Sequence, residues 1–124
     1  MKIPLYSGGM FNEKILAHFR DPHNPGELSD ATHRAQVTNP VCGDVLRLTL
    51  RIDGEGVIAQ ARFKAQGCVP AIAAASALTD MLVGKTLTDA RRIMPREIVS
   101  ELGGLPQASA HAAELCCDAI AALS

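Results

Sequence analysis

The sequence predicts an α+β domain in which a small three-stranded antiparallel sheet is covered on one side by about five helices. Three observations predict it. Apolar and polar residues alternate over 45–52 and again over 57–65, which is the period of β-strands. From Gly67 onward the apolar spacing becomes that of helices. The 124 residues are the length of one domain, which we take to span residues 1–124.

Composition excludes several classes of protein. With 48 % hydrophobic residues and a net charge of −1, the chain is too apolar for a disordered protein. The same charge, with 3 % aromatic residues, argues against nucleic-acid binding, which usually needs a basic excess or stacking aromatics. We expect no membrane insertion, because every apolar run is far too short for a span. Residues 1–10 lack the apolar stretch of a secretory signal.

The first predicted helix covers Phe11–Arg20, with Asn12 as a plausible cap, and ends at a run of breakers over 21–26. Its apolar residues recur at helical spacing: Phe11, Ile15, Leu16 and Phe19.

A β-hairpin is predicted next, with strands over 45–52 and 57–65 and a turn at 53–56 that contains two glycines. Alternation places Ile58 on the polar face of the second strand, opposite Ala61 and Phe63. Residues 35–39 are expected to add an edge strand that stops at Pro40.

A long helix is predicted after the hairpin, with Pro70 in its first turn and Gly84 as its stop. Its expected apolar stripe consists of Ile72, Ala73, Ala77, Leu78, Met81 and Leu82.

Three shorter helices complete the prediction. Thr86 opens the first through a capping box, and Pro95 ends it. A short helix covers 95–102, and the last helix begins at Ser109 as its cap and continues through Ala122.

The four cysteines, Cys42, Cys68, Cys116 and Cys117, are interpreted as thiols rather than disulfides. A domain of this size can build a sufficient hydrophobic core without disulfide bonds. The absence of an export signal favours a reducing compartment, so we expect a cytoplasmic protein.

Cys42 and Cys68 carry the candidate chemistry. Cys42 precedes the first hairpin strand and Cys68 follows the second, so antiparallel pairing brings both to one edge of the sheet. Cys68 also adjoins a helix N-terminus, which favours a thiolate, and Asp44 adds a hard oxygen ligand. Either cysteine alone is typical of an inert core thiol. Together, each beside a glycine, they favour a site for zinc, ferrous iron or an iron–sulfur cluster.

The other histidines are weaker candidates for the site. We expect His18 to pack or cap near the end of the first helix, where a protonated imidazole interacts well with the helix dipole. His23 and His33 are expected to be solvated, and Lys85 is expected to be a surface charge.

The chain resembles the IscU/NifU-type iron–sulfur cluster assembly scaffolds over nearly its whole length. The matching motifs are Asn12-Glu13-Lys14, His18-Phe19, Asp21-Pro22-His23-Asn24, Cys42-Gly43-Asp44, Arg62-Phe63-Lys64, Gly67-Cys68, Ala71-Ile72-Ala73, Ser76, Gly84-Lys85, Leu105-Pro106, His111, Leu115 and Asp118-Ala119-Ile120.

This resemblance implies a scaffold rather than an enzyme. On such proteins a cluster, typically [2Fe-2S], is built from Fe²⁺ and from sulfur that a cysteine desulfurase delivers as a persulfide, and it then passes to acceptor apo-proteins. The family's ligand positions match Cys42, Asp44, Cys68 and His111. The aspartate keeps the family's cluster labile.

The resemblance fails at one family ligand, because Ala112 stands where the family has its third cysteine, directly after the histidine. On a helix, Cys116 would lie about 40° from Ala112 and about 6 Å further along the axis. Cys116 is therefore a candidate substitute ligand, and Cys117, about 140° away, lies on another side. Core packing explains this pair equally well.

Two further departures and two alternatives remain. The stretch 105–109 lacks the second proline and the lysine that a dedicated Hsp70-type chaperone recognises in relatives, so that partner is not carried over. Pro70, where relatives have small residues, removes a backbone donor near Cys68. One alternative is a zinc-bound SufU-type sulfur acceptor, although the insertion of that branch between Cys42 and Cys68 is missing. The other is a degenerate, non-catalytic binding or regulatory homologue. A homodimer or homo-oligomer stays open.

Overall fold

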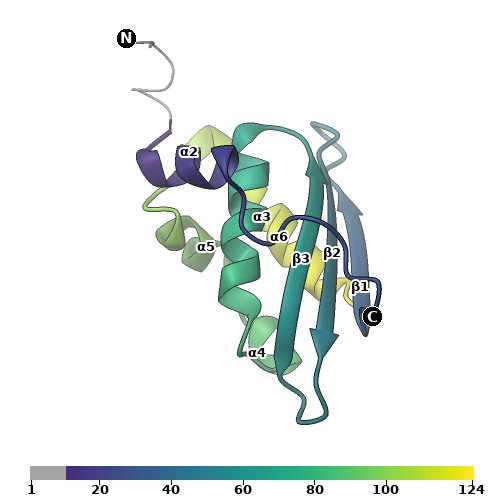
Figure 1. Ribbon diagram of the computed structural model, residues 1–124. Helices are drawn as coiled ribbons and strands as arrows, with labels where there is room; N and C mark the ends of the chain where they lie inside the picture. Colours follow the sequence, from purple (N-terminus) through teal and green to yellow (C-terminus); the bar gives the residue numbers. More distant parts are fainter. Residues whose placement is uncertain (1–10) are drawn as a thin grey trace.

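The computed structural model describes residues 11–124 and has the predicted α+β architecture (Figure 1). Its sheet has three antiparallel strands in the order β1-β2-β3, and α3 and α6 pack on one face of it. The elements are α2 (Glu13–Arg20), β1 (His33–Thr38), β2 (Val45–Ile52), β3 (Ile58–Gln66), α3 (Val69–Leu82), α4 (Leu87–Ala90), α5 (Pro95–Glu101), the 3₁₀ turn η1 (Gln107–Ser109) and α6 (His111–Ala121). No helix in the part of the chain described is both long and apolar enough to cross a membrane.

Helix α2 begins at Glu13, two residues later than predicted, because Asn12 is its cap. The Asn12 side-chain oxygen accepts a hydrogen bond from the Ile15 amide at 2.9 Å, as a cap should. Its side-chain nitrogen donates to the Leu102 carbonyl at 3.0 Å, which fastens α2 to the end of α5.

The β2–β3 hairpin lies where it was predicted, but one side chain faces the opposite way. Ile58 was expected on the polar face and is instead fully buried. The register shifts between Arg51 and Ile52, so that Arg51 pairs with Gln60 and Ile52 pairs with Ile58. This bulge turns Ile58 into the core, a change that strict alternation cannot predict. Edge strand β1 begins at His33 and ends at Thr38, slightly earlier than expected.

Helix α3 is buried on nearly all sides, so the prediction of an apolar stripe was wrong. Ala74, Ala75, Ser76 and Thr79, outside that stripe, are fully buried, while Ile72 and Met81 within it are only partly buried. The reason is position: α3 contacts β3 on one side and α2, α5 and α6 on others (Figure 1). A helix enclosed in this way need not be amphipathic.

Two later helices also differ from their predictions. The helix expected from Thr86 to Pro95 ends at Ala90, although the Thr86 hydroxyl does accept from the Asp89 amide at 3.1 Å. The chain then tightens into a turn that buries Ile93. Ser109 does not cap α6, which begins at His111, because Ser109 belongs to the preceding 3₁₀ turn.

The segment from Asp21 to Thr32, which begins with the predicted run of breakers, crosses the sheet on its way to β1 (Figure 1). Gly26 donates to the Phe63 carbonyl at 2.8 Å, and the Leu28 amide donates to the Thr49 hydroxyl at 3.1 Å. Leu28 and Thr49 are therefore both buried on the face of the sheet that the helices leave uncovered.

Candidate metal centre

The candidate site lies at the edge of the sheet where β2 begins and β3 ends. Val45 pairs with Gln66, so the residue before β2, Asp44, meets the turn that follows β3 and holds Cys68. The pairing that the sequence predicted for this edge is confirmed.

Asp44 is the centre of the arrangement, and its side chain is buried, with the residue only 5 % exposed. The Cys68 thiol donates to Asp44 Oδ2 at 3.2 Å. His111 Nε2 lies 3.7 Å from that same oxygen and 3.7 Å from Cys68 Sγ. One carboxylate oxygen, one thiol and one imidazole nitrogen therefore converge on a single point.

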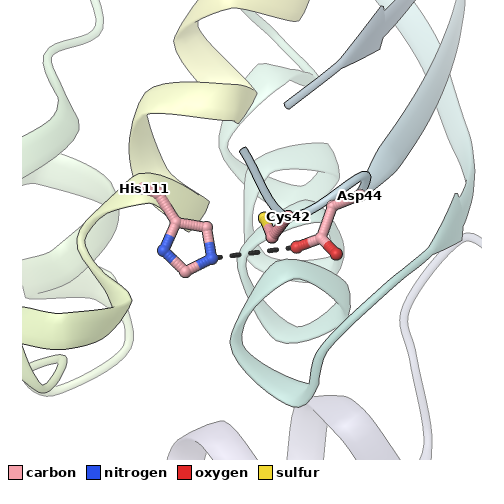
Figure 2. Close-up of side chains that lie close together, drawn as sticks. All are labelled: Cys42, Asp44 and His111. Carbon is pink, nitrogen blue, oxygen red and sulfur yellow. Dashed lines mark ion pairs between the residues drawn. The ribbon is translucent and has the colours of Figure 1, made fainter. Parts of the chain in front are cut away.

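Cys42 approaches Asp44 and His111 from the exposed side. One ligand atom each from Cys42, Asp44 and His111 lie within 4.8 Å of one another (Figure 2). In that view, His111 points from the start of α6 towards the loop that carries the other two residues. Cys42 is exposed, whereas Cys68 is half-buried, so the two thiols differ in access to solvent.

The loop that carries Cys42 is shaped by Asn39. Its side-chain oxygen accepts from the amides of Val41 at 2.9 Å and Cys42 at 3.4 Å, and its carbonyl accepts from Gly43 at 2.8 Å. Gly43 has a φ of +77°, a conformation that glycine adopts without strain. These contacts turn the chain sharply enough to place Cys42 and Asp44 on the same side.

The metal-free Cys68 is a thiol, which corrects the expectation of a thiolate. Burial, and then the neighbouring Asp44, raise its pKa above the ordinary value for cysteine. The Ala71 amide at the start of α3 lowers the pKa, as the helix argument predicted, but its effect is smaller than that of burial. Metal binding at Cys68 must therefore release a proton, since only the thiolate is a ligand.

The structure does not bring Cys116 or Cys117 to this group. Cys116 is 1 % exposed in the core, where burial raises the pKa of its thiol far above the ordinary value. Cys117 is half-buried, and its thiol donates to the Ile93 carbonyl at 3.5 Å. Ala112 is fully buried. These placements are those of packing residues.

A second polar cluster was missed at the level of sequence. His18 Nδ1 lies 2.7 Å from the hydroxyl of the fully buried Ser76, which also accepts from the His23 amide at 2.8 Å. The His23 ring contacts Asp80. The pKa of His18 is lowered, first by burial and then by His23, which disfavours the expected protonated imidazole. His23 is exposed, as expected, although it also contacts Asp80.

One signal in the sequence could have revealed this cluster. Ser76, Thr79 and Asp80 are polar residues at helical spacing in an otherwise alanine-rich helix. Polar groups on a buried helix need partners, and the Asp-Pro-His-Asn loop supplies them.

The site offers two soft thiols, one hard carboxylate and one imidazole. Zinc is held by such mixtures of sulfur, nitrogen and oxygen, and iron–sulfur clusters are held by thiolates with histidine as a known substitute. The arrangement can therefore hold an inorganic centre that is bound less firmly than by four thiolates.

Comparison with known proteins places the chain among others of this architecture. The family described as "NifU-like N terminal domain" matches residues 10–123. The chain is 43 % identical over 106 residues to the iron–sulfur cluster assembly scaffold protein IscU of Aquifex aeolicus, covering 85 % of this chain and 68 % of that protein. It is 37 % identical over 115 residues to the protein of the same description from Escherichia coli strain K12, covering 90 % and 89 %.

Solved structures are also similar in fold. Among them is one described as a putative iron–sulfur cluster assembly scaffold protein for the SUF system from Fervidobacterium islandicum, which matches with a TM-score of 0.70 over 90 % of this chain and 93 % of its own. At 17 % identity, this likeness concerns the fold alone.

Proposed function

The chain belongs to the family of NifU-like N-terminal domains, and from this premise we propose that it is a scaffold on which an iron–sulfur cluster is assembled and then handed to acceptor proteins. The cluster is cargo, so the protein acts as a carrier and not as an enzyme. A scaffold of this kind needs a sulfur donor and cluster acceptors, and we propose a cysteine desulfurase as the donor. The cytoplasm, where thiols stay reduced, is the compartment we propose.

We propose Cys42, Asp44, Cys68 and His111 as the four ligands. The observation that carries this assignment is the buried Asp44 carboxylate, which lies 3.2 Å from one thiol and 3.7 Å from the imidazole. A buried carboxylate beside a thiol with a raised pKa has no evident packing role, because buried charges are expensive unless a partner compensates them. A cationic metal would compensate it.

The four donors suffice for a [2Fe-2S] cluster despite Ala112. Each iron of such a cluster takes two protein ligands, and histidine nitrogen can stand in for cysteine sulfur. Two thiolates, one imidazole and one carboxylate therefore complete the set without a third cysteine. Because a carboxylate is a harder and poorer partner for this centre than a thiolate, we expect the cluster to be labile, as a scaffold requires.

Anaerobic reconstitution with ferrous iron and sulfide tests the proposal. The wild-type protein should give a coloured species with sulfur-to-iron charge-transfer absorption, and Cys42→Ala and Cys68→Ala should each abolish it. The matched control is Cys117→Ala, which removes a half-buried thiol outside the site and should leave the spectrum intact.

Two other outcomes would redirect the proposal. Tightly bound zinc with no coloured species would favour a zinc-containing sulfur acceptor. Neither metal, with unchanged folding in both variants, would indicate a degenerate homologue. Samples handled in air must be excluded, since exposed thiols such as Cys42 oxidise.

A further inference from the structure

The Asp44 side chain packs directly against the backbone of Gly67. A Cβ atom added to Gly67 would lie 2.5 Å from both Cγ and Oδ1 of Asp44 and 3.0 Å from its Cβ. No real side chain tolerates contacts at 2.5 Å, so the carboxylate occupies the space that any other residue at position 67 would fill. Gly67 also has a φ of +155°, which side chains rarely adopt.

Few other contacts fix this carboxylate. The main-chain oxygen of Asp44 accepts a hydrogen bond from the Asn39 amide at 2.8 Å, and Val45 pairs with Gln66, but both contacts fix the backbone and not the side chain. Among the described residues, the ion-pair partner of the carboxylate is His111 at 3.7 Å, not a lysine or an arginine. Packing against Gly67 is therefore what sets the direction of the side chain.

That direction decides whether the carboxylate reaches the other ligands. Oδ2 contacts Cys68 and His111, while Oδ1 of the same rigid group is the atom that would meet a Cβ at position 67. A shift that relieves one oxygen moves the other. An alanine at position 67 must therefore swing the carboxylate away from the thiol.

We infer that Gly67 is a positioning residue: its missing side chain holds the Asp44 carboxylate against Cys68, and so supplies the oxygen donor of the site. Where this concerns metal affinity, the inference rests on the proposed function. With Ala112 in place of a third thiol, the centre depends on this oxygen to complete its donors.

Gly84 provides a control outside the site. It too has a positive φ, of +94°, yet nothing lies within 4 Å of a Cβ built on it. Gly84→Ala therefore introduces backbone strain without displacing a side chain and without altering the loop that carries Cys42 and Asp44. A change in Cys68 reactivity or zinc affinity that Gly67→Ala shows and Gly84→Ala does not is assigned to the contact with Asp44.

The first experiment needs no metal. In the metal-free protein, the rate at which iodoacetamide alkylates Cys68 is followed by peptide-resolved mass spectrometry at one pH. Gly67→Ala and Asp44→Gly should both raise this rate severalfold, because the thiol loses the carboxylate that accepts its hydrogen bond, while Gly84→Ala should leave it unchanged. An unchanged rate in Gly67→Ala would overturn the inference.

The second experiment measures zinc affinity by competition with a chelator. Gly67→Ala should weaken zinc binding about ten- to a hundredfold, as loss of an orienting contact typically does. Asp44→Gly should weaken it at least as much, and the double variant should be no weaker than Asp44→Gly alone. Independent, additive losses would mean that Gly67 does not act through Asp44, and would overturn the inference.

The thermal stability of the Asp44 and Gly67 variants tests the clash itself. If Gly67→Ala is poorly folded because of the clash, the double variant Asp44→Gly/Gly67→Ala should unfold at a higher temperature than Gly67→Ala, since the clashing atoms are gone. A double variant no more stable than Gly67→Ala would contradict the clash. Should the wild-type protein bind neither zinc nor iron, the proposed function fails, whereas the alkylation result still decides the role of Gly67.

Discussion

Removing the Ser76 hydroxyl should destabilise the protein measurably, because one buried oxygen serves two segments. In Ser76→Ala, the His23 amide loses its acceptor at 2.8 Å and the His18 ring nitrogen loses its partner at 2.7 Å. A buried polar group left without a partner costs about 1–3 kcal/mol. Both partners are only part-buried, so water recovers some of this, and we expect a total loss of about 2 kcal/mol.

Urea-induced unfolding of the metal-free protein measures this loss. For a chain of this length, about 2 kcal/mol corresponds to a fall in Tm of roughly 8 °C. The control is Ser100→Ala on the exposed side of α5, which should change the free energy of unfolding by no more than about 0.5 kcal/mol. If Ser76→Ala stays within that same margin, the hydroxyl does not hold the segment before β1 against α3, and the reasoning is refuted.

The remaining predictions concern pH, the core thiol and metal binding. Burial lowers the pKa of His18 in the folded protein, so the unfolded chain binds the proton more readily. The contribution of His18 to the free energy of unfolding should be fully present above about pH 6.5 and should fall as the pH drops below that value. His18→Gln should flatten the pH profile measured by urea unfolding between about pH 7.5 and 5.5. A profile equally steep in the variant would contradict this. Cys116→Ser should lower the free energy of unfolding by about 1–3 kcal/mol, because it places a hydroxyl in the core, and should leave the zinc affinity unchanged. A loss of zinc affinity would mean that Cys116 belongs to the metal site. Zinc at a hundredfold excess over its Kd should stabilise the wild-type fold by about 2.7 kcal/mol in thermal unfolding, and Cys68→Ala should remove this gain; an undiminished gain would place zinc elsewhere.

Local patterns in the sequence were enough to predict the hairpin and the edge of the sheet that gathers the site. Strict alternation over β2 and the glycine turn after it determine which strands pair, and this pairing brings Asp44 to Cys68 without further information. The cap at Asn12 was equally readable, because a cap acts within one turn of helix.

What could not be predicted depends on contacts distant in sequence. The bulge that buries Ile58 and the enclosure of α3 arise from packing between elements. A thiolate at Cys68 was predicted from the helix end beside it, but burial raises the pKa of this thiol more strongly than the helix end lowers it, and Asp44 adds to the rise; both belong to the tertiary structure. The close approach of Asp44 to Gly67 likewise has no signature beyond a glycine in a turn.

X-ray absorption at the zinc edge, with zinc as a probe of the metal-free protein, tests most directly whether the four side chains share one centre. We expect two sulfur neighbours at about 2.3 Å and two nitrogen or oxygen neighbours at about 2.0–2.1 Å. Cys42→Ala and Cys68→Ala should each leave a single sulfur neighbour. Three sulfurs in the wild-type protein, or two that survive the loss of Cys42 or Cys68, would contradict the assignment of the site.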